Sequence, residues 1–189
     1  GMIIASGGNI FLGILAGLGT GAAFGLANGL LITKLKIAPF LVTFAMQSVV
    51  RGILLLSTTN GAVSGFAAEE FTYLAQGYFL GLPIPVVITV IVFVILLFLF
   101  KFTSFGRNVT AIGSNREASF LSGVSCDKIT IGVYMLSGLL AALSGILLAA
   151  RLTAVQSEMG SGYEMDAIAA AVIGGTSMAG GKGSTIGAI

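Results

Sequence analysis

Apolar residues gather into four long runs along the chain, separated by shorter and more polar segments. The runs cover residues 10–33, 40–57, 85–100 and 129–152. Crossing a hydrocarbon core of about 30 Å takes about 20 apolar residues in an α-helix, so each run predicts a membrane span. Pro39 and Pro85 stand at the start of the second and third runs, where a first helical turn tolerates proline, and Asp127 precedes the fourth as a predicted helix cap.

Composition agrees with this pattern. Hydrophobic residues make up 56% of the chain and charged residues only 8%, whereas a soluble domain carries about 25% charged residues. A water-soluble fold of this length would lack the polar groups to cover its surface. We therefore expect an all-α, polytopic transmembrane helical bundle surrounded by a lipid bilayer. The net charge of +2 gives no argument for nucleic acid, and histidine, the commonest metal ligand, is absent.

Basic residues are distributed unevenly among the connecting segments. Lys34 and Lys36 follow the first run, and four more basic residues lie within 101–128, whereas segments 58–84 and 153–166 contain acidic residues but no Lys or Arg. Cytoplasmic loops of membrane proteins carry the excess of Lys and Arg. The pattern therefore predicts that 34–38 and 101–128 are cytoplasmic and that 58–84 and 153–166 are external.

Glycine recurs at every fourth position of the first run. The residues of this stripe are Gly13, Gly17, Gly21, Gly25 and Gly29. Missing side chains let two membrane helices approach closely, so the stripe predicts a helix-packing face. The alternative is that glycine is simply frequent in membrane helices.

The segment 101–128 is too long for a tight turn. Ser114 and Glu117 have the spacing of a capping box, in which each side chain satisfies the other residue's backbone N–H. Gly123 is a natural left-handed helix stop. These features predict a short helix over 114–123 at the inner face of the membrane, and an ordinary surface helix is the alternative.

A second short apolar run, residues 167–173, is too short to cross a bilayer. Asp166 is expected to cap its start, and Gly174 and Gly175 to break its end. Gln156 and Glu164 lie nearby in the sequence. Such a broken or re-entrant half-helix is typical of transport paths, and a surface loop joining two helices is the alternative.

Three motifs look like nucleotide-binding or catalytic sites but lack residues or context that such sites require. The glycines at 17 and 19 lie inside an apolar run with no preceding strand, which excludes a dinucleotide fold, and Gly180–Gly183 lacks the first glycine and final Ser or Thr of a phosphate loop. Glu164 and Asp166 have no partner base or metal ligand. We therefore expect no catalytic residue, no metal site and no cofactor bound by this chain.

Three stretches resemble the permeases of ribose-type (monosaccharide) ABC importers. They are AIGSNREAS at 111–119 followed by LSGV at 121–124, YMLSGLLAALSGILLAAR at 134–151, and GYEMDAIAAAVIGGTS at 162–177. Residues 28–51 match as well, and the resemblance is weakest over 57–84. Ser119 departs from the general importer pattern, which has a second alanine there.

The resemblance implies a multi-pass permease subunit in the bacterial cytoplasmic membrane. It implies as partners a second permease copy, a periplasmic sugar-binding protein and a cytoplasmic ABC ATPase that holds the ATP and Mg²⁺. The short helix would be the coupling helix, with the following residues contacting the ATPase: Ser114, Glu117, Ala118, Ser119, Leu121 and Gly123. Candidate residues for the translocation path are Gln47, Gln156, Tyr163, Glu164, Asp166, Gly174, Gly175 and Thr176.

Two further expectations complete the interpretation. An ion-gradient-driven secondary transporter or a channel is the alternative function, although such proteins usually place ionisable residues within their spans, and Arg51 is the only charge clearly inside one here. Because a new apolar run begins at Thr185–Ile189, we also expect the chain to be a piece of a longer permease.

Overall fold

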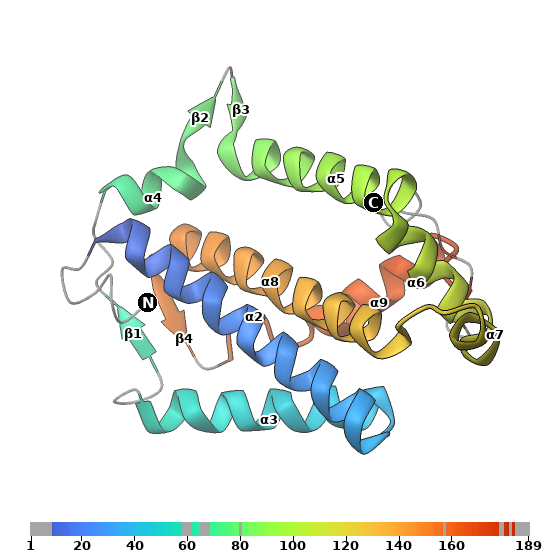
Figure 1. Ribbon diagram of the computed structural model, residues 1–189. Coiled ribbons are helices and arrows are strands. Elements are labelled where there is room, and N and C mark those ends of the chain that lie inside the picture. The colour runs from blue at the N-terminus through green and yellow to red at the C-terminus, as the bar shows by residue number, and fades with distance from the viewer. Residues whose placement is uncertain are drawn as a thin grey trace. The chain divides into compact units, whose positions relative to one another are not determined.

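The computed structural model describes residues 9–57, 62–64, 69–79, 81–156, 158–177, 180, 181 and 183. Within these residues, four helices are long and apolar enough to cross a membrane. They are α2 (Ile10–Leu35), α3 (Pro39–Ser57), α5 (Ile84–Phe102) and α8 (Cys126–Leu152) (Figure 1). The prediction of an all-α polytopic protein is confirmed, and each predicted run lies wholly within one of these helices, which extends beyond the run by at most three residues at either end.

The chain divides into two compact units. The first contains residues 1–88 and 131–159, and the second contains 89–130 and 160–189. Helices α5 and α8 each contribute residues to both units, and each unit is described by itself below.

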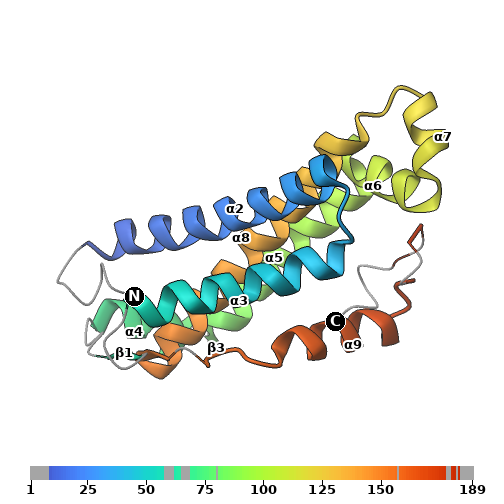
Figure 2. The same cartoon turned by 90° about the horizontal axis from the view of Figure 1, so that it is seen from below.

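In the first unit, α2 and α8 run side by side, as Figures 1 and 2 agree. Asn9 caps α2, its side chain accepting a hydrogen bond from the Phe11 N–H at 3.0 Å. At the other end, Lys36 adopts the left-handed conformation (φ 54°) that ends the helix. Pro39 then opens α3 without a lost hydrogen bond, because the first helical N–H groups have no partner within the helix.

Short elements join the long helices of the first unit. Strand β1 (Ala62–Ser64) pairs antiparallel with β4 (Ala154–Gln156), with Val63 opposite Val155. Helix α4 (Glu69–Gln76) follows, and β2 (Tyr78–Phe79) pairs with β3 (Leu82–Pro83) in a small hairpin. Phe71 of α4 packs in a small buried core with Ala149 and Ala150 of α8. The hydrophobic pattern predicted none of these short elements.

The second unit contains three shorter helices, α6 (Ser104–Ser114), α7 (Arg116–Leu121) and α9 (Tyr163–Ile173). Thr103 caps α6 by accepting from the Gly106 N–H. Gly106 lies directly against the backbone of Phe100, so the chain can turn sharply out of α5 only because this residue has no side chain. Helix α6 was not predicted, because its sequence mixes polar and apolar residues without a long run.

Large apolar side chains cover the outside of the long helices. No residue of α5 is buried, and Phe40, Leu41 and Phe44 at the start of α3 are all at least 60% exposed. Soluble proteins rarely expose contiguous apolar surface on this scale. These faces therefore fit contact with lipid or with further membrane helices.

Candidate functional site

Helix α7 begins differently from the sequence prediction. Its N-cap is Asn115, whose side-chain oxygen accepts a hydrogen bond from the Ala118 N–H at 2.9 Å. Ser114 is instead the last residue of α6, and its hydroxyl donates to the Thr110 carbonyl at 3.0 Å. The predicted capping box of Ser114 and Glu117 is therefore wrong. Asparagine caps a helix as well as serine does, and Asn115, one residue after Ser114, takes that role here.

The end of α7 agrees with the sequence. Gly123 adopts the left-handed conformation at φ 83°. The Gly123 N–H donates to the Phe120 carbonyl at 3.0 Å, and the Val124 N–H donates to the Ser119 carbonyl at 3.1 Å. This pair of bonds is a Schellman motif, which glycine favours because it has no Cβ to clash. The predicted stop at Gly123 is confirmed.

Contacts with the start of α8 hold this short helix in place. Arg116 Nη2 lies 2.7 Å from Asp127 Oδ1, and each side chain is about half exposed. The Cys126 thiol lies 3.6 Å from the Arg116 carbonyl, and Cys126 is buried. Asp127, which the sequence suggested as a cap, lies in the first turn of α8 and pairs with Arg116 instead. A helix of six residues would be unstable alone, so these contacts account for its order.

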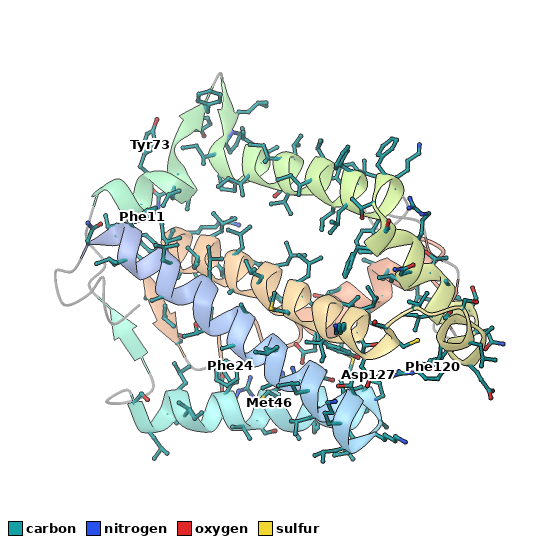
Figure 3. All side chains as sticks on the ribbon, in the orientation of Figure 1. Phe11, Phe24, Met46, Tyr73, Phe120 and Asp127 are labelled. Atoms are coloured by element: carbon teal, nitrogen blue, oxygen red, sulfur yellow. The ribbon has the colours of Figure 1, made fainter. Side chains whose placement is uncertain are left out.

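The exposed surface of α7 is more apolar than the predicted contact residues suggested. Phe120 is 69% exposed and Leu121 is 81% exposed, while Glu117 and Ala118 are exposed beside them. Figure 3 labels Phe120 on this helix. Ser119 is buried, and its hydroxyl donates to the Asn115 carbonyl at 2.8 Å. Ser119 therefore faces the protein and not a partner, which corrects its predicted role.

The predicted residue set omitted Phe120. Had the sequence analysis placed the helix start at Arg116, Phe120 would have been recognised as one of the six residues of this helix and as a candidate for contact with a partner. We call the four side chains of Glu117, Ala118, Phe120 and Leu121 the α7 surface.

The glycine stripe of α2 lies against α8. A methyl group added at Gly25 would lie 2.9 Å from the Met135 Cα, and one added at Gly29 would lie 2.8 Å from the Ile131 Cα. Gly21 approaches Gly138 and Ala142, and Gly17 approaches Ile146. Gly13 is buried as well. A Cβ atom at Gly21, Gly25 or Gly29 would lie within 3 Å of a backbone atom of α8. Helices α2 and α8 can therefore pack this closely only because these positions are glycine.

Helix α9 starts earlier than the apolar run suggested. It begins at Tyr163 after Gly162, which has φ 90° and makes no side-chain cap bond. Asp166 therefore lies within the first turns and does not cap the helix, which corrects the prediction. Glu164 Oε2 accepts a hydrogen bond from the Gly162 N–H at 3.1 Å. A carboxylate is favourable at this end of a helix because the helix dipole is positive at its N-terminus.

The predicted break after α9 is confirmed. Gly175 is left-handed at φ 88°, its N–H donates to the Val172 carbonyl, and the Thr176 N–H donates to the Ala171 carbonyl, both at 3.0 Å. This is a second Schellman motif. No helix continues among the described residues that follow.

The candidate path residues fall into two groups. Gln47 on α3 and Gln156 on β4 belong to the first unit, and the candidates from Tyr163 to Thr176 belong to the second. Within the second unit, α9 brings Tyr163, Glu164 and Asp166 to one end and Thr176 beyond the other. Among the residues that the structure describes, no three acidic or cysteine side chains gather as a metal site would require.

The chain is similar in sequence to sugar-transport permeases of several bacteria. It is 44% identical over 188 residues to the ribose import permease protein RbsC of Bacillus subtilis, covering 99% of this chain and 58% of that protein. The RbsC protein of Escherichia coli K12 is 42% identical over 184 residues, covering 96% of this chain and 57% of its own. The L-arabinose ABC transporter permease protein AraH of Azospirillum brasilense is 37% identical over 187 residues. That match covers 99% of this chain and 55% of AraH.

The chain thus spans a little over half the length of these curated relatives. No solved structure matches it. The family described as the permease component of branched-chain amino acid transport systems matches residues 1–189, the whole chain. The match over the entire chain, together with relatives above 40% identity, places this protein in that family of transport-system permeases.

Proposed function

We propose that the protein is the membrane permease subunit of an ATP-binding-cassette importer and forms the translocation path for a monosaccharide. It lies in the bacterial cytoplasmic membrane and works with a cytoplasmic ABC ATPase, a periplasmic sugar-binding protein and a second permease copy. The ATPase supplies ATP hydrolysis, so this chain carries no catalytic step.

One observation carries the coupling role. The α7 surface presents two large apolar side chains, Phe120 and Leu121, on a helix that is capped by Asn115 and tied to α8 by the Arg116–Asp127 pair. Basic residues concentrate in the same segment, which supports a cytoplasmic position. An amphipathic helix with apolar anchors is a common way to occupy a groove in a partner protein. The groove here belongs to the ATPase.

The substrate class follows from the relatives. The names of the relatives above specify ribose and L-arabinose, and a further relative in Haemophilus influenzae, 38% identical over 183 residues, is named for galactose and methyl galactoside. The family description instead specifies branched-chain amino acids. The relatives match nearly the whole chain at 37–44% identity, so we assign a monosaccharide. Cells expressing the full-length protein with its ATPase and binding protein should accumulate labelled ribose, arabinose or galactose. Accumulation of labelled leucine with no sugar uptake would contradict the assignment.

The coupling role is tested by Ala118→Trp. Ala118 is exposed, so the variant should fold and insert normally. The indole should prevent the α7 surface from entering a groove, because close-packed contacts do not absorb so large a side chain. We expect sugar uptake to fall at least about tenfold, a loss of ~1.4 kcal/mol of productive contact or more. ATP hydrolysis should no longer respond to sugar-loaded binding protein.

Ala111→Trp is the matched control, because Ala111 is an exposed alanine on the neighbouring helix α6. It should transport nearly as well as the unmodified protein. An Ala118→Trp variant that copurifies with its ATPase and transports normally would remove the coupling role and favour a gradient-driven transporter or a channel.

A further inference from the structure

A patch of large aromatic and aliphatic side chains lies exposed beside the start of α5, within the first unit. It consists of Tyr73 near the end of α4 and Tyr78, Phe79 and Leu82 of the β2–β3 hairpin, which are between 54% and 67% exposed. We call these four side chains the hairpin surface. Figure 3 shows Tyr73 pointing outward from α4. The described part of the chain leaves more than half of each of these residues uncovered, so the hairpin surface needs a partner.

The hairpin is held at its base by the junction of α4 and α5. The Gly77 N–H donates to the Tyr73 carbonyl at 2.8 Å, and the Ile84 N–H donates to the Gly77 carbonyl at 3.0 Å. A methyl group added at Gly77 would lie 2.7 Å from the Ile84 Cδ1 and 2.8 Å from the Tyr73 Cε2. Glycine therefore lets the end of α4 meet the start of α5 closely, and this contact sets the position of the hairpin.

Both faces of the hairpin carry apolar side chains. Phe79 lies opposite Leu82, and Tyr78 lies opposite Pro83. Residues that lie opposite each other in an antiparallel pair share a face, and successive residues point to opposite faces. One face therefore presents Phe79 with Leu82, and the other presents Tyr78 with Pro83.

The contact between α4 and α8 fixes the level of the hairpin surface relative to the membrane. Phe71 of α4 packs in a buried core with Ala149 and Ala150, and α8 ends at Leu152. At 1.5 Å per residue, these alanines lie about 3–5 Å from that end. Because α8 has 27 residues and is about 40 Å long, its ends extend past a hydrocarbon core of ~30 Å. Helix α4 therefore lies at the boundary of the membrane, and the hairpin follows it directly.

The charge pattern favours lipid over a protein as the partner. Residues 71–100 contain no Asp, Glu, Lys or Arg. This uncharged stretch leads from the hairpin surface into α5, in which no residue is buried. Entry into a bilayer is costly for charged groups, whereas protein partners are usually selected by complementary charges. The hairpin surface thus continues the lipid-facing surface of α5.

The backbone limits how deep the hairpin can lie. A two-stranded sheet leaves unpaired N–H and C=O groups along the outer edge of each strand. Open sheet edges do not occur in the hydrocarbon region, where water cannot satisfy them. The hydrated headgroup region can satisfy them, and tyrosine suits it because the ring is apolar while the hydroxyl reaches water.

We propose that the hairpin surface is inserted into the boundary between headgroups and acyl chains, on the membrane face at which α5 begins. Figure 1 shows the hairpin projecting sideways from the first turn of α5, across the axis of that helix. The hairpin therefore extends along the membrane plane and holds the start of α5 at a fixed depth. The insertion does not depend on the proposed transport function.

The insertion is tested with single tryptophans, because the 189 residues contain none. The full-length protein, with any tryptophan outside these residues replaced by phenylalanine, is reconstituted into phosphatidylcholine vesicles. Phe79→Trp should lose fluorescence when the acyl chains carry bromine near the headgroup and lose less when the bromine is near the chain ends. Iodide present on both sides of the membrane should quench it weakly.

Two further positions calibrate the measurement. Val94→Trp, at an exposed apolar position near the middle of α5, should be quenched most by bromine near the chain ends. Glu158→Trp, at an exposed position after β4, should be quenched by iodide and not by brominated lipid. If Phe79→Trp responds as Glu158→Trp does, the hairpin lies in water and the insertion is overturned. Resistance to both quenchers would mean that protein covers the hairpin, which would also overturn it.

Tyr78→Trp repeats the test on the other face of the hairpin and remains available if Phe79→Trp does not fold. Because both faces are apolar, this variant should also be quenched by bromine near the headgroup. Strong quenching of Tyr78→Trp by iodide, with none by brominated lipid, would place that face in water and contradict the proposal. None of these measurements needs an ATPase, a binding protein or a sugar.

Discussion

Single residues set the ends of the short helix that presents the α7 surface. The Asn115 amide accepts the Ala118 N–H, Gly123 supplies a left-handed stop, and Arg116 pairs with Asp127 eleven residues later. Each contact is small in free energy, and an exposed ion pair contributes only about 0–1 kcal/mol. Together they order six residues that would otherwise not hold a helical turn.

The first residue-scale prediction concerns the cap. Asn115→Ala should destabilise α7 by about 1 kcal/mol, because the Ala118 N–H loses its acceptor. Backbone amide hydrogens of α7 should then exchange about fivefold faster with solvent, as measured by hydrogen–deuterium exchange. Sugar uptake should weaken without being abolished.

Two variants frame this prediction. Asn115→Asp retains a capping oxygen and should behave almost as the unmodified protein. Ser114→Ala removes only a hydroxyl bond to the preceding turn of α6, so α7 exchange should be unchanged. If Ser114→Ala accelerates α7 exchange more than Asn115→Ala does, the assignment of the cap is incorrect.

At the scale of elements, the contact between α2 and α8 organises the first unit. The stripe on α2 meets Gly138 and its neighbours on α8, and Thr33 satisfies its own hydroxyl by donating to the Gly29 carbonyl at 2.8 Å. In a bilayer, helices gain no hydrophobic free energy by leaving lipid, so close van der Waals contact must hold them together. Glycine at the interface provides that contact.

The element-scale prediction is a loss of packing in Gly25→Leu. The added side chain would meet the backbone of Tyr134 and Met135, and overpacking of this kind typically costs about 1–3 kcal/mol. The purified protein should unfold at a lower temperature and yield less monodisperse material in detergent. Gly19→Leu on the same helix is the matched control, since nothing lies within 4 Å of its Cβ position. Equal loss in both variants would show that the stripe is only compositional.

At the scale of the whole molecule, the distribution of charge predicts the orientation in the membrane. Four basic residues lie within 101–128, up to the start of α8, and the acidic segment 153–166 follows the end of α8. The large apolar side chains that α3 and α5 expose require lipid or further helices around them.

The corresponding prediction uses an impermeant thiol reagent on intact cells. In a Cys126→Ala background, Ser161→Cys should be labelled and Ser104→Cys should be labelled only after the membrane is opened, because cytoplasmic loops retain the basic residues. Labelling at 104 without labelling at 161 would reverse the orientation.

The sequence by itself determined the long helices, the family and the glycine-based helix stops. Four apolar runs of membrane length leave few alternatives to spanning helices. Gly123 and Gly175 end helices for a local reason, the absence of a Cβ, which needs no knowledge of distant contacts. The resemblance at 111–124 and 162–177 likewise depends on adjacent residues alone.

Only the tertiary structure decided which residues face a partner and which face the protein. The choice between Ser114 and Asn115 as cap depended on α6 running into α7, and only the folded chain shows that Ser119 is buried while Phe120 is exposed. The partner of the glycine stripe lies more than 100 residues away, on α8. Such contacts join residues distant in sequence, and hydrophobic periodicity carries no information about which distant element fills a given face.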